Sequence, residues 1–593
     1  MAVQSSIKAL KPFSPAILAP RDDEQVHASI LVFTSLITVL FFVIKHHRKP
    51  PSISQNKRPI TAHGCLPFIG HALAVITCPE SFLRQLLCKL CSTPIQVLLP
   101  TGRFYLGSPG DQATWLLKSG RQTVPTPSLL YAFQIFFGLK REDLKVFEHS
   151  NISIAEARLG FSTSHQDPSR RIMEHQRRDF RLYLRGPGLN PIIHRFLGIL
   201  KDEMFQRTAI ANDWVEVPDL YTFVVTKVFR SEVEALYGRH IFATCPNLEE
   251  DFWRFYDAFP RISLGLPRWL SASCYRTRDK MLENLRRWRI SCQNTRRLND
   301  PDLRNAEYDS IWGCRYTQRM LSRFFALGFT EDGVDTAMLG FFFATFANTI
   351  PAAAWMMLHL HLNDGMVDRV RAELSKTALD KSGFVRLDDL AQQPLLNSIY
   401  YETLRLRVAG TVGRQSPIKI QAPGGWEFGA NFPMLIPSWL SGLDSSFWNT
   451  GGTLPDGKSQ HPVDKFWGER FLQYPDDPLS GPVRKEHSSH QNPAAKAPQR
   501  SESDDCSAQL VTKGTQGHWF PFGGGTSKCP GEALAGQTIL TAVVFMLCNF
   551  DIQLCAPKEA GEIRSQHRAL PFGSHAFDRP VPIRIRRRKH LRY

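Results

Sequence analysis

The fold of this chain is decided by the stretch Trp519–Gly531, which has the sequence WFPFGGGTSKCPG. The stretch contains the pattern F-x-x-G-x-x-x-C-x-G, with Phe522, Gly525, Cys529 and Gly531 at its fixed positions. With 40 Phe, 39 Gly and 12 Cys in 593 residues, composition alone predicts roughly 0.004 occurrences of the pattern. The stretch is therefore interpreted as a loop built around one cysteine.

The chemistry of this loop suits a flat, metal-containing ligand. Three consecutive glycines let the backbone turn sharply and lie close to a planar group. Cys529 precedes an apolar segment that is expected to be helical from Gly531 to about Cys548. The unpaired N–H groups at the start of a helix favour a thiolate, and a thiolate ligand helps iron to cleave O–O bonds. The alternative is a glycine-rich turn around a cysteine that is only part of the core.

The loop resembles the haem-binding loop of the cytochrome P450 family, and the resemblance extends from the N-terminal apolar segment to the last helix. It implies a mainly α fold, in which a helical body carries small β-sheets. It also implies haem b, with Cys529 as the metal ligand and with Phe522, Gly525 and Gly531 binding the cofactor. Electrons would come from NADPH through a separate NADPH–cytochrome P450 reductase. The segment 341–352 resembles the branch of sterol 7α-hydroxylases and prostacyclin synthases.

That segment reads FFFATFANTIPA and is apolar on nearly every face, so we expect a helix that crosses the interior. It resembles the family's oxygen-binding helix, with Asn348 and Thr349 in place of the usual acid–threonine pair. Pro351 has no N–H to donate to the carbonyl of Ala347, so the helix is expected to open there. Asn348 and Thr349 are the predicted catalytic residues. The alternative is a proline-kinked core helix whose Thr349 hydroxyl bonds back to its own backbone.

Two arginine motifs predict a buried charge triad. Glu402 and Arg405 form an E-x-x-R pattern, which places both side chains on one face of a helix. The segment 466–471, FWGERF, resembles the family's second arginine motif and adds Arg470. We assign Glu402, Arg405 and Arg470 to structure, because removing one member of a buried triad strands a charge.

Three further residues are candidates for binding the haem propionates. Arg414 lies nine residues after Arg405 and has the charge that a propionate requires. The W-x-x-x-R pattern that is common in the family is missing from its usual place. His175 and Arg178 are the nearest substitutes there.

The N-terminus predicts a membrane anchor. Residues 28–44 are an uncharged run, followed at once by the basic cluster 45–49. A run of this length is just sufficient for a transmembrane helix, and the basic flank is expected to stay in the cytosol. Residues 1–27 would then be non-cytosolic, and residues 45–70 would be a Pro-rich linker to a catalytic domain over 71–593. Acidic residues before the run and the absence of a cleavage site disfavour the alternative, a signal peptide.

Composition limits the remaining partners. The formal net charge of +17 suits an anionic membrane face or an acidic protein partner. The basic residues are dispersed and no nucleic-acid motif appears, so no nucleic-acid partner is expected. The 12 cysteines show no disulfide spacing, which indicates a reducing compartment. The combined prediction is a single-pass protein of the endoplasmic reticulum membrane with its catalytic domain in the cytosol.

Residues 474–516 are polar and are expected to form an exposed insertion.

The leading functional interpretation is a monooxygenase that acts on a bulky apolar substrate, such as a steroid or terpenoid, in secondary metabolism. The second is a haem-thiolate isomerase or dehydratase that rearranges an oxygenated lipid without external electrons. The third is a membrane-tethered haem sensor. Thr349 separates them, because oxygen activation uses such a hydroxyl and the other two functions do not need it. The Phe-rich segments 131–137 and 341–346 are expected either to line the substrate pocket or to be plain core.

Overall fold

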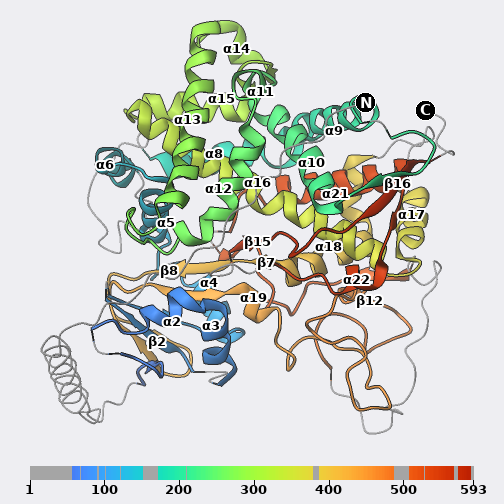
Figure 1. Ribbon diagram of the computed structural model, residues 1–593. Helices are drawn as coiled ribbons and strands as arrows, with labels where there is room; N and C mark the ends of the chain where they lie inside the picture. The colour runs from blue at the N-terminus through green and yellow to red at the C-terminus, as the bar shows by residue number, and fades with distance from the viewer. Residues whose placement is uncertain are drawn as a thin grey trace, which may run out of the picture.

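A computed structural model describes residues 57–588, apart from residues 67, 90–92, 101, 121, 151–170, 209, 378–385, 486–506, 526–527 and 567–571. The predicted anchor at 28–44 and the segment 1–27 lie outside the described residues. The described part is mainly helical with small sheets, as the sequence predicts. Figure 1 shows most of the helices gathered on one side of the molecule, with the largest sheet and α4 below them.

The helices of the first half of the chain form the upper and left parts of the body in Figure 1. They are α2 (Ala72–Thr77), α3 (Pro79–Lys89), α4 (Asp111–Lys118), α5 (Thr126–Ala132), α6 (Arg141–Ser150), α8 (Ile172–Tyr183), α9 (Asn190–Phe205), α10 (Leu220–Tyr237), α11 (His240–Thr244), α12 (Leu248–Ile262) and α13 (Ala272–Thr295). A π-helical turn, η1 (Phe133–Phe137), continues α5, and the 3-10 turn η3 (Gly186–Gly188) follows α8.

The remaining helices follow in the second half of the chain. They are α14 (Pro301–Asn305), α15 (Arg315–Ala326), α16 (Glu331–Leu362), α17 (Met366–Thr377), α18 (Pro394–Arg407), α19 (Ser438–Ser441), α21 (Glu532–Asn549) and α22 (Pro557–Gly561), with the 3-10 turn η4 (Leu387–Gln392) before α18.

The strands form one five-stranded sheet, one three-stranded sheet and several pairs. The five-stranded sheet has the order β1 (Ile60–Thr61), β2 (Ile95–Leu99), β3 (Gly102–Leu106), β11 (Met434–Pro437), β8 (Thr411–Arg414). The three-stranded sheet is β14 (Phe550–Leu554), β16 (Ile583–Arg587), β4 (Val215–Val217). The pairs are β10 (Trp426–Phe428) with β9 (Ile420–Ala422), β12 (Leu472–Gln473) with β13 (Gln509–Leu510), β15 (Gly573–Ser574) with β7 (Val408–Ala409), and β5 (Tyr308–Asp309) with β6 (Gly313–Cys314).

The central element is α16, whose 32 residues run through the interior. Its first turn is well capped, because the Thr330 hydroxyl accepts from the Gly333 N–H at 3.0 Å and Asp143 accepts from the Thr330 N–H at 2.7 Å. The helix is apolar all round and packs against α10, α13, α18 and α21. It remains helical through Pro351, so the expected opening does not interrupt it. Packing on every side compensates for the one missing backbone bond.

Within the described part of the chain, two helices, α16 and α21, are long and apolar enough to cross a membrane. In both, more than two thirds of the apolar window is buried inside the protein, at 78% and 72%. They are therefore core helices of the body.

The expected insertion 474–516 is exposed over a shorter range than its composition suggests. At its start, the Asn449 amide donates to the carbonyls of Leu479 and Gly481 at 2.9 and 2.8 Å, and Ser480 is buried. At its end, β13 pairs with β12 and Thr515 is buried. The Asn449 side chain of the body thus satisfies backbone carbonyls at the start of this segment. Residues 486–506 lie outside the described part of the chain.

Candidate functional site

The loop around Cys529 borders a cavity of about 220 Å³. On one side the cavity is lined by Phe520–Gly523 and Cys529, and on the other by the backbone of Gly410–Arg414. The Cys529 N–H donates to the Phe522 carbonyl at 2.8 Å, which closes the loop on itself. Gly525 has a φ of 64°, and a Cβ there would overlap the Leu117 carbonyl oxygen of α4. The glycine is thus required by both the turn and the close approach.

The Cys529 thiol opens onto this cavity, and its surroundings act on its charge in opposite directions. Burial raises the pKa of Cys529, and the nearby Glu532 carboxylate adds to this. The Gly531 N–H and the positive charges of Arg185 and Lys528 lower the pKa, but burial prevails. The helix start alone therefore does not produce the thiolate that the sequence suggested. A coordinated metal ion would, because metal binding deprotonates a thiol.

Arg414 lines the same cavity from β8 and is only 5% exposed. Its guanidinium donates to the Gly413 and Gly524 carbonyls at 2.9 and 3.2 Å, and burial lowers its pKa. Among the described residues no carboxylate pairs with it. A buried cation without an anionic partner is costly, and a carboxylate-bearing ligand in the cavity would relieve this cost. The thiol, the glycine turn and Arg414 together fit a haem whose propionate meets Arg414.

His175 and Arg178 lie on α8, and Arg178 is exposed. Neither side chain lines the cavity that Cys529 and Arg414 share. The structure therefore supports Arg414 as a propionate partner better than these two residues.

The structure brings Glu402, Arg405 and Arg470 together with fully buried side chains. Arg405 donates to both Glu402 oxygens at 2.7 Å, and Arg470 donates to Oε1 at 3.0 Å. Burial opposes ionisation of Glu402, but the two guanidinium groups outweigh it and hold its pKa below the usual value. Because the two arginines also donate to the carbonyls of Gly442 and Asn449, the triad fixes α18 to the loops that lead into the site.

On α16, Thr349 is buried, at 5% exposure, and its hydroxyl has no hydrogen-bond partner among the described residues. The hydroxyl of Thr345, one turn earlier, instead donates back to the Phe341 carbonyl at 2.8 Å. The alternative role, in which Thr349 bonds to its own helix, therefore fits Thr345 and not Thr349. Asn348 accepts the Ser574 backbone N–H at 3.2 Å through Oδ1.

The Phe-rich segments divide between core and pocket. Phe342 and Phe346 pack on aromatic rings of α10 and α12 and are core residues. Phe343 also packs on α12, where it stacks on Phe259 with the ring centroids 4.0 Å apart. Phe259 in turn lies 4.8 Å from Phe572.

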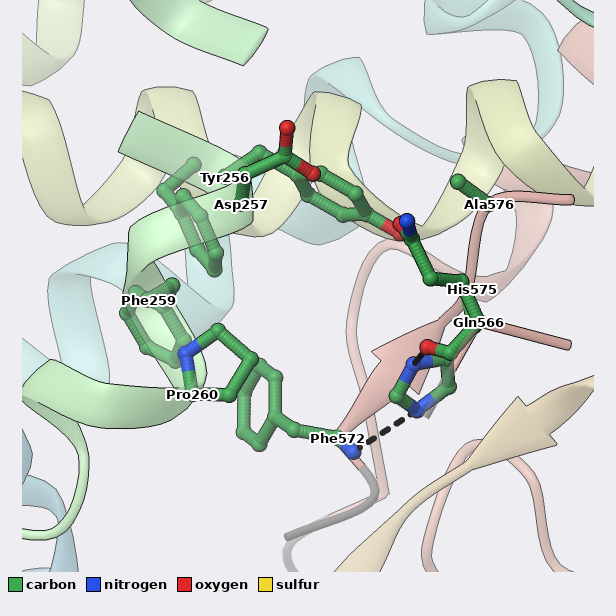
Figure 2. A pocket seen from close by; sticks show the side chains of 9 residues that line it. Tyr256, Asp257, Phe259, Pro260, Gln566, Phe572, His575 and Ala576 are labelled. Carbon is green, nitrogen blue, oxygen red and sulfur yellow. Dashed lines mark hydrogen bonds between the residues drawn. The ribbon is translucent and has the colours of Figure 1, made fainter. Parts of the chain in front are cut away.

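These three rings border a second pocket, between α12 and residues 566 and 572–576. Figure 2 shows Phe259, Pro260 and Phe572 together on one side, with His575 and Gln566 on the other. The His575 ring is fixed at both nitrogens, since Nε2 accepts from the Phe572 N–H at 3.1 Å and Nδ1 lies 3.0 Å from the Gln566 carbonyl. The pocket thus has an aromatic wall and a polar, rigidly held rim.

Sequence reasoning missed the residues that reach the site from distant segments. Arg185 acts on the charge of Cys529 from the end of α8, and no local pattern marks it. Phe259 lies in the aromatic-rich segment 252–259, which sequence reasoning did not select, and Phe572 has no aromatic residue beside it in the sequence. Ser574 belongs to a two-residue strand, which is too short to show an alternating pattern.

Comparisons with known proteins agree with this geometry. The family model described as Cytochrome P450 matches residues 237–451, which include α16 and α18. The cytochrome P450 monooxygenase fsoE of Humicola fuscoatra is 30% identical over 90% of this chain and 88% of its own length. The cytochrome P450 monooxygenase efuG of Hormonema carpetanum is 29% identical over 94% of this chain and 95% of its own length. The cytochrome P450 monooxygenase calL of Penicillium decumbens is 26% identical over 65% of each chain.

The helical body, the cysteine loop and a buried Arg414 without a carboxylate partner in the described part of the chain fit the class of haem-thiolate enzymes. The chain belongs to the cytochrome P450 family. It is an oxidoreductase of the monooxygenase type. Members of this family hold haem through a thiolate and take electrons from a redox partner.

Proposed function

We propose that this protein uses O₂ and NADPH-derived electrons to hydroxylate or oxidise a bulky apolar substrate, of steroid or terpenoid type, in secondary metabolism. The overall reaction inserts one oxygen atom into a C–H bond and reduces the other to water, with two electrons from NADPH. The observation that carries the proposal is the hydroxyl of the buried residue Thr349, which has no hydrogen-bond partner among the described residues. The named relatives, all called monooxygenases, support this over the isomerase alternative.

In this proposal Cys529 would hold haem b through its sulfur, and the bound haem would supply oxygen activation. The chain's own residues do the rest. Arg414 holds a propionate, and Phe522 and the glycine turn shield the sulfur. Thr349 holds and passes a proton through its hydroxyl, and Asn348 takes part through its amide, since it cannot ionise.

The substrate class is inferred from the aromatic wall. Phe137 and Phe255 extend the wall of Phe259 and Phe343, with centroids 5.9 and 5.2 Å from Phe343. Such a wall suits an apolar group, and the Gln566 and His575 rim suits one polar group on it. The pocket itself is only about 30 Å³, so a bulky substrate would have to displace part of its lining.

The membrane anchor at 28–44 would hold the enzyme on the endoplasmic reticulum with its catalytic body in the cytosol. The reductase would dock on the face of the cysteine loop, where Lys528 is exposed. Lys528 is also 2.7 Å from Glu532, which offsets part of its charge. The docking face would therefore depend on further basic residues, such as Arg185.

Replacing Thr349 by Ala tests the proposal. Positioned proton transfer contributes roughly 10²–10⁴-fold in general, so we expect product per NADPH to fall at least several-fold. The lost electrons should appear as hydrogen peroxide, formed from O₂, two electrons and two protons. Product and peroxide per NADPH would be measured with a steroid and terpenoid panel, with ¹⁸O₂ as the oxygen source.

Thr345→Ala is the matched control, because it removes the same hydroxyl one turn earlier, where it bonds only to the helix backbone. We expect this variant to keep the wild-type ratio of product to peroxide. Product that forms without reductase and carries no ¹⁸O would contradict the monooxygenase and favour the isomerase.

A further inference from the structure

Strand β15 and the residue after it, His575, are fastened to α16 by two hydrogen bonds, beside residues that line the pocket of Figure 2. At one point the Ser574 N–H donates to Asn348 Oδ1 at 3.2 Å. At the other the Trp355 indole N–H donates to the His575 carbonyl at 2.7 Å. The Tyr256 hydroxyl of α12 also donates to the Ser574 carbonyl. Ser574 is thus held between α12, which borders the pocket, and the central helix α16.

The contact with Asn348 fixes the orientation of its amide. A backbone N–H can only donate, so the amide atom that faces Ser574 has to be the oxygen. The Asn348 NH₂ group therefore points elsewhere, and it makes no hydrogen bond among the described residues. An Asn whose amide could rotate freely would present either group. Here the amide is held as a donor beside Thr349.

The neighbouring glycine shows how closely the strand approaches. Gly573 has a φ of +63°, and a Cβ at this position would overlap Asn348 Oδ1. A side chain there would push the Asn348 amide out of its place. The pairing of β15 with β7 places Gly573 opposite Ala409 and holds the Gly573 backbone close to Asn348.

We infer that Gly573 and Ser574 position Asn348, holding its amide as a hydrogen-bond donor and linking it to the substrate pocket. The inference rests on the proposed function, in which Asn348 and Thr349 guide protons. The link follows from the chain itself, because Phe572 and His575 line the pocket directly beside the two positioning residues. A substrate that displaces Phe572 would move the N–H that orients Asn348.

Backbone hydrogen exchange tests the positioning without any turnover. In the wild-type holoenzyme the Ser574 amide should exchange slowly, and Asn348→Ala should speed its exchange roughly 5-fold, as expected for one lost hydrogen bond. Asn348→Asp keeps an acceptor oxygen at the same place and should retain the slow exchange. Equal exchange of Ser574 in the wild type and in Asn348→Ala would overturn the inference, whatever the enzyme's activity.

A second pair of variants tests the consequence for the reaction. Gly573→Ala should raise the share of NADPH electrons recovered as hydrogen peroxide at least 2-fold. Gly365→Ala is the control, since Gly365 has a similar φ of +71° but open space around its Cβ. Equal peroxide shares in the two variants would overturn the link between Gly573 and catalysis. Slow Ser574 exchange together with an insensitive Thr349→Ala variant would instead count against the proposed function alone.

Discussion

Glu402 and Glu232 are both buried, with 0% and 1% of their surfaces exposed, yet their surroundings favour opposite charge states. Glu402 accepts from two guanidinium groups and from the Trp467 N–H at 3.2 Å, and its pKa is lowered. Glu232, on α10, accepts one bond from the Thr538 hydroxyl of α21 at 3.2 Å, and its second oxygen has no partner. Burial raises its pKa to about 8.

The difference shows that depth alone does not decide ionisation in this core. At equal burial the number and charge of the donors decide it. In the triad region the groups are charged, both Glu402 oxygens accept hydrogen bonds, and the network fixes loops beside the haem site. The region around Glu232, between α10 and α21, is neutral and leaves one carboxyl oxygen without a hydrogen bond among the described residues. It therefore stabilises the fold less than an apolar contact would.

Removing the charge of Glu402 should have the largest effect. Glu402→Gln leaves two buried guanidinium groups without their counter-ion, so we expect a loss of about 3–5 kcal/mol in the free energy of unfolding. Haem content should fall with it, because the triad holds the loops of the site. Chemical unfolding and the haem-to-protein ratio measure the two effects. Glu80→Gln, at an exposed pair with Arg84, should cost under about 1 kcal/mol. An equal loss in both variants would remove the distinction.

Glu232→Gln should act in the opposite direction and depend on pH. The folded-state pKa of Glu232 is raised to about 8, so between pH 4.5 and 8 the unfolded chain ionises this group while the folded protein keeps it protonated. The wild type therefore loses stability relative to the variant as pH rises through this window. By pH 8 the variant should be more stable by about 2–4 kcal/mol, at about 1.4 kcal/mol per pKa unit.

The measurement is the urea midpoint of both proteins at several pH values from 5 to 8. A stability difference that stays constant over this range would show that Glu232 is not protonated in the folded state. The comparison with Glu402 would then lose its basis.

Local motifs allowed the Glu402–Arg405 pair, the cysteine loop and the central helix to be predicted, whereas Arg470, 68 positions from Glu402, was added by a resemblance to the family. Arg405 follows Glu402 by three positions, and the apolar period of α16 needs no distant partner. The contacts that the sequence could not indicate join residues far apart. Glu232 and Thr538 are separated by 306 positions, and Asn348 and Ser574 by 226. Whether a buried polar group is satisfied depends on such pairings, and a single sequence does not contain them.

The smallest expected effects distinguish the two threonines of α21 that lie near Glu232. The Thr541 hydroxyl is buried without a partner, whereas the Thr538 hydroxyl donates to Glu232. Thr541→Val removes an unsatisfied polar group and keeps the shape, so it should stabilise the protein by about 1 kcal/mol. Thr538→Val removes the one bond that Glu232 has from a side chain, so it should destabilise the protein by about 1 kcal/mol. Opposite signs in chemical unfolding are expected from these neighbouring, chemically identical changes. If both variants lost stability equally, the Thr541 hydroxyl would have a hydrogen-bond partner in solution. The buried polar groups of this region would then be as fully hydrogen-bonded as those of the triad.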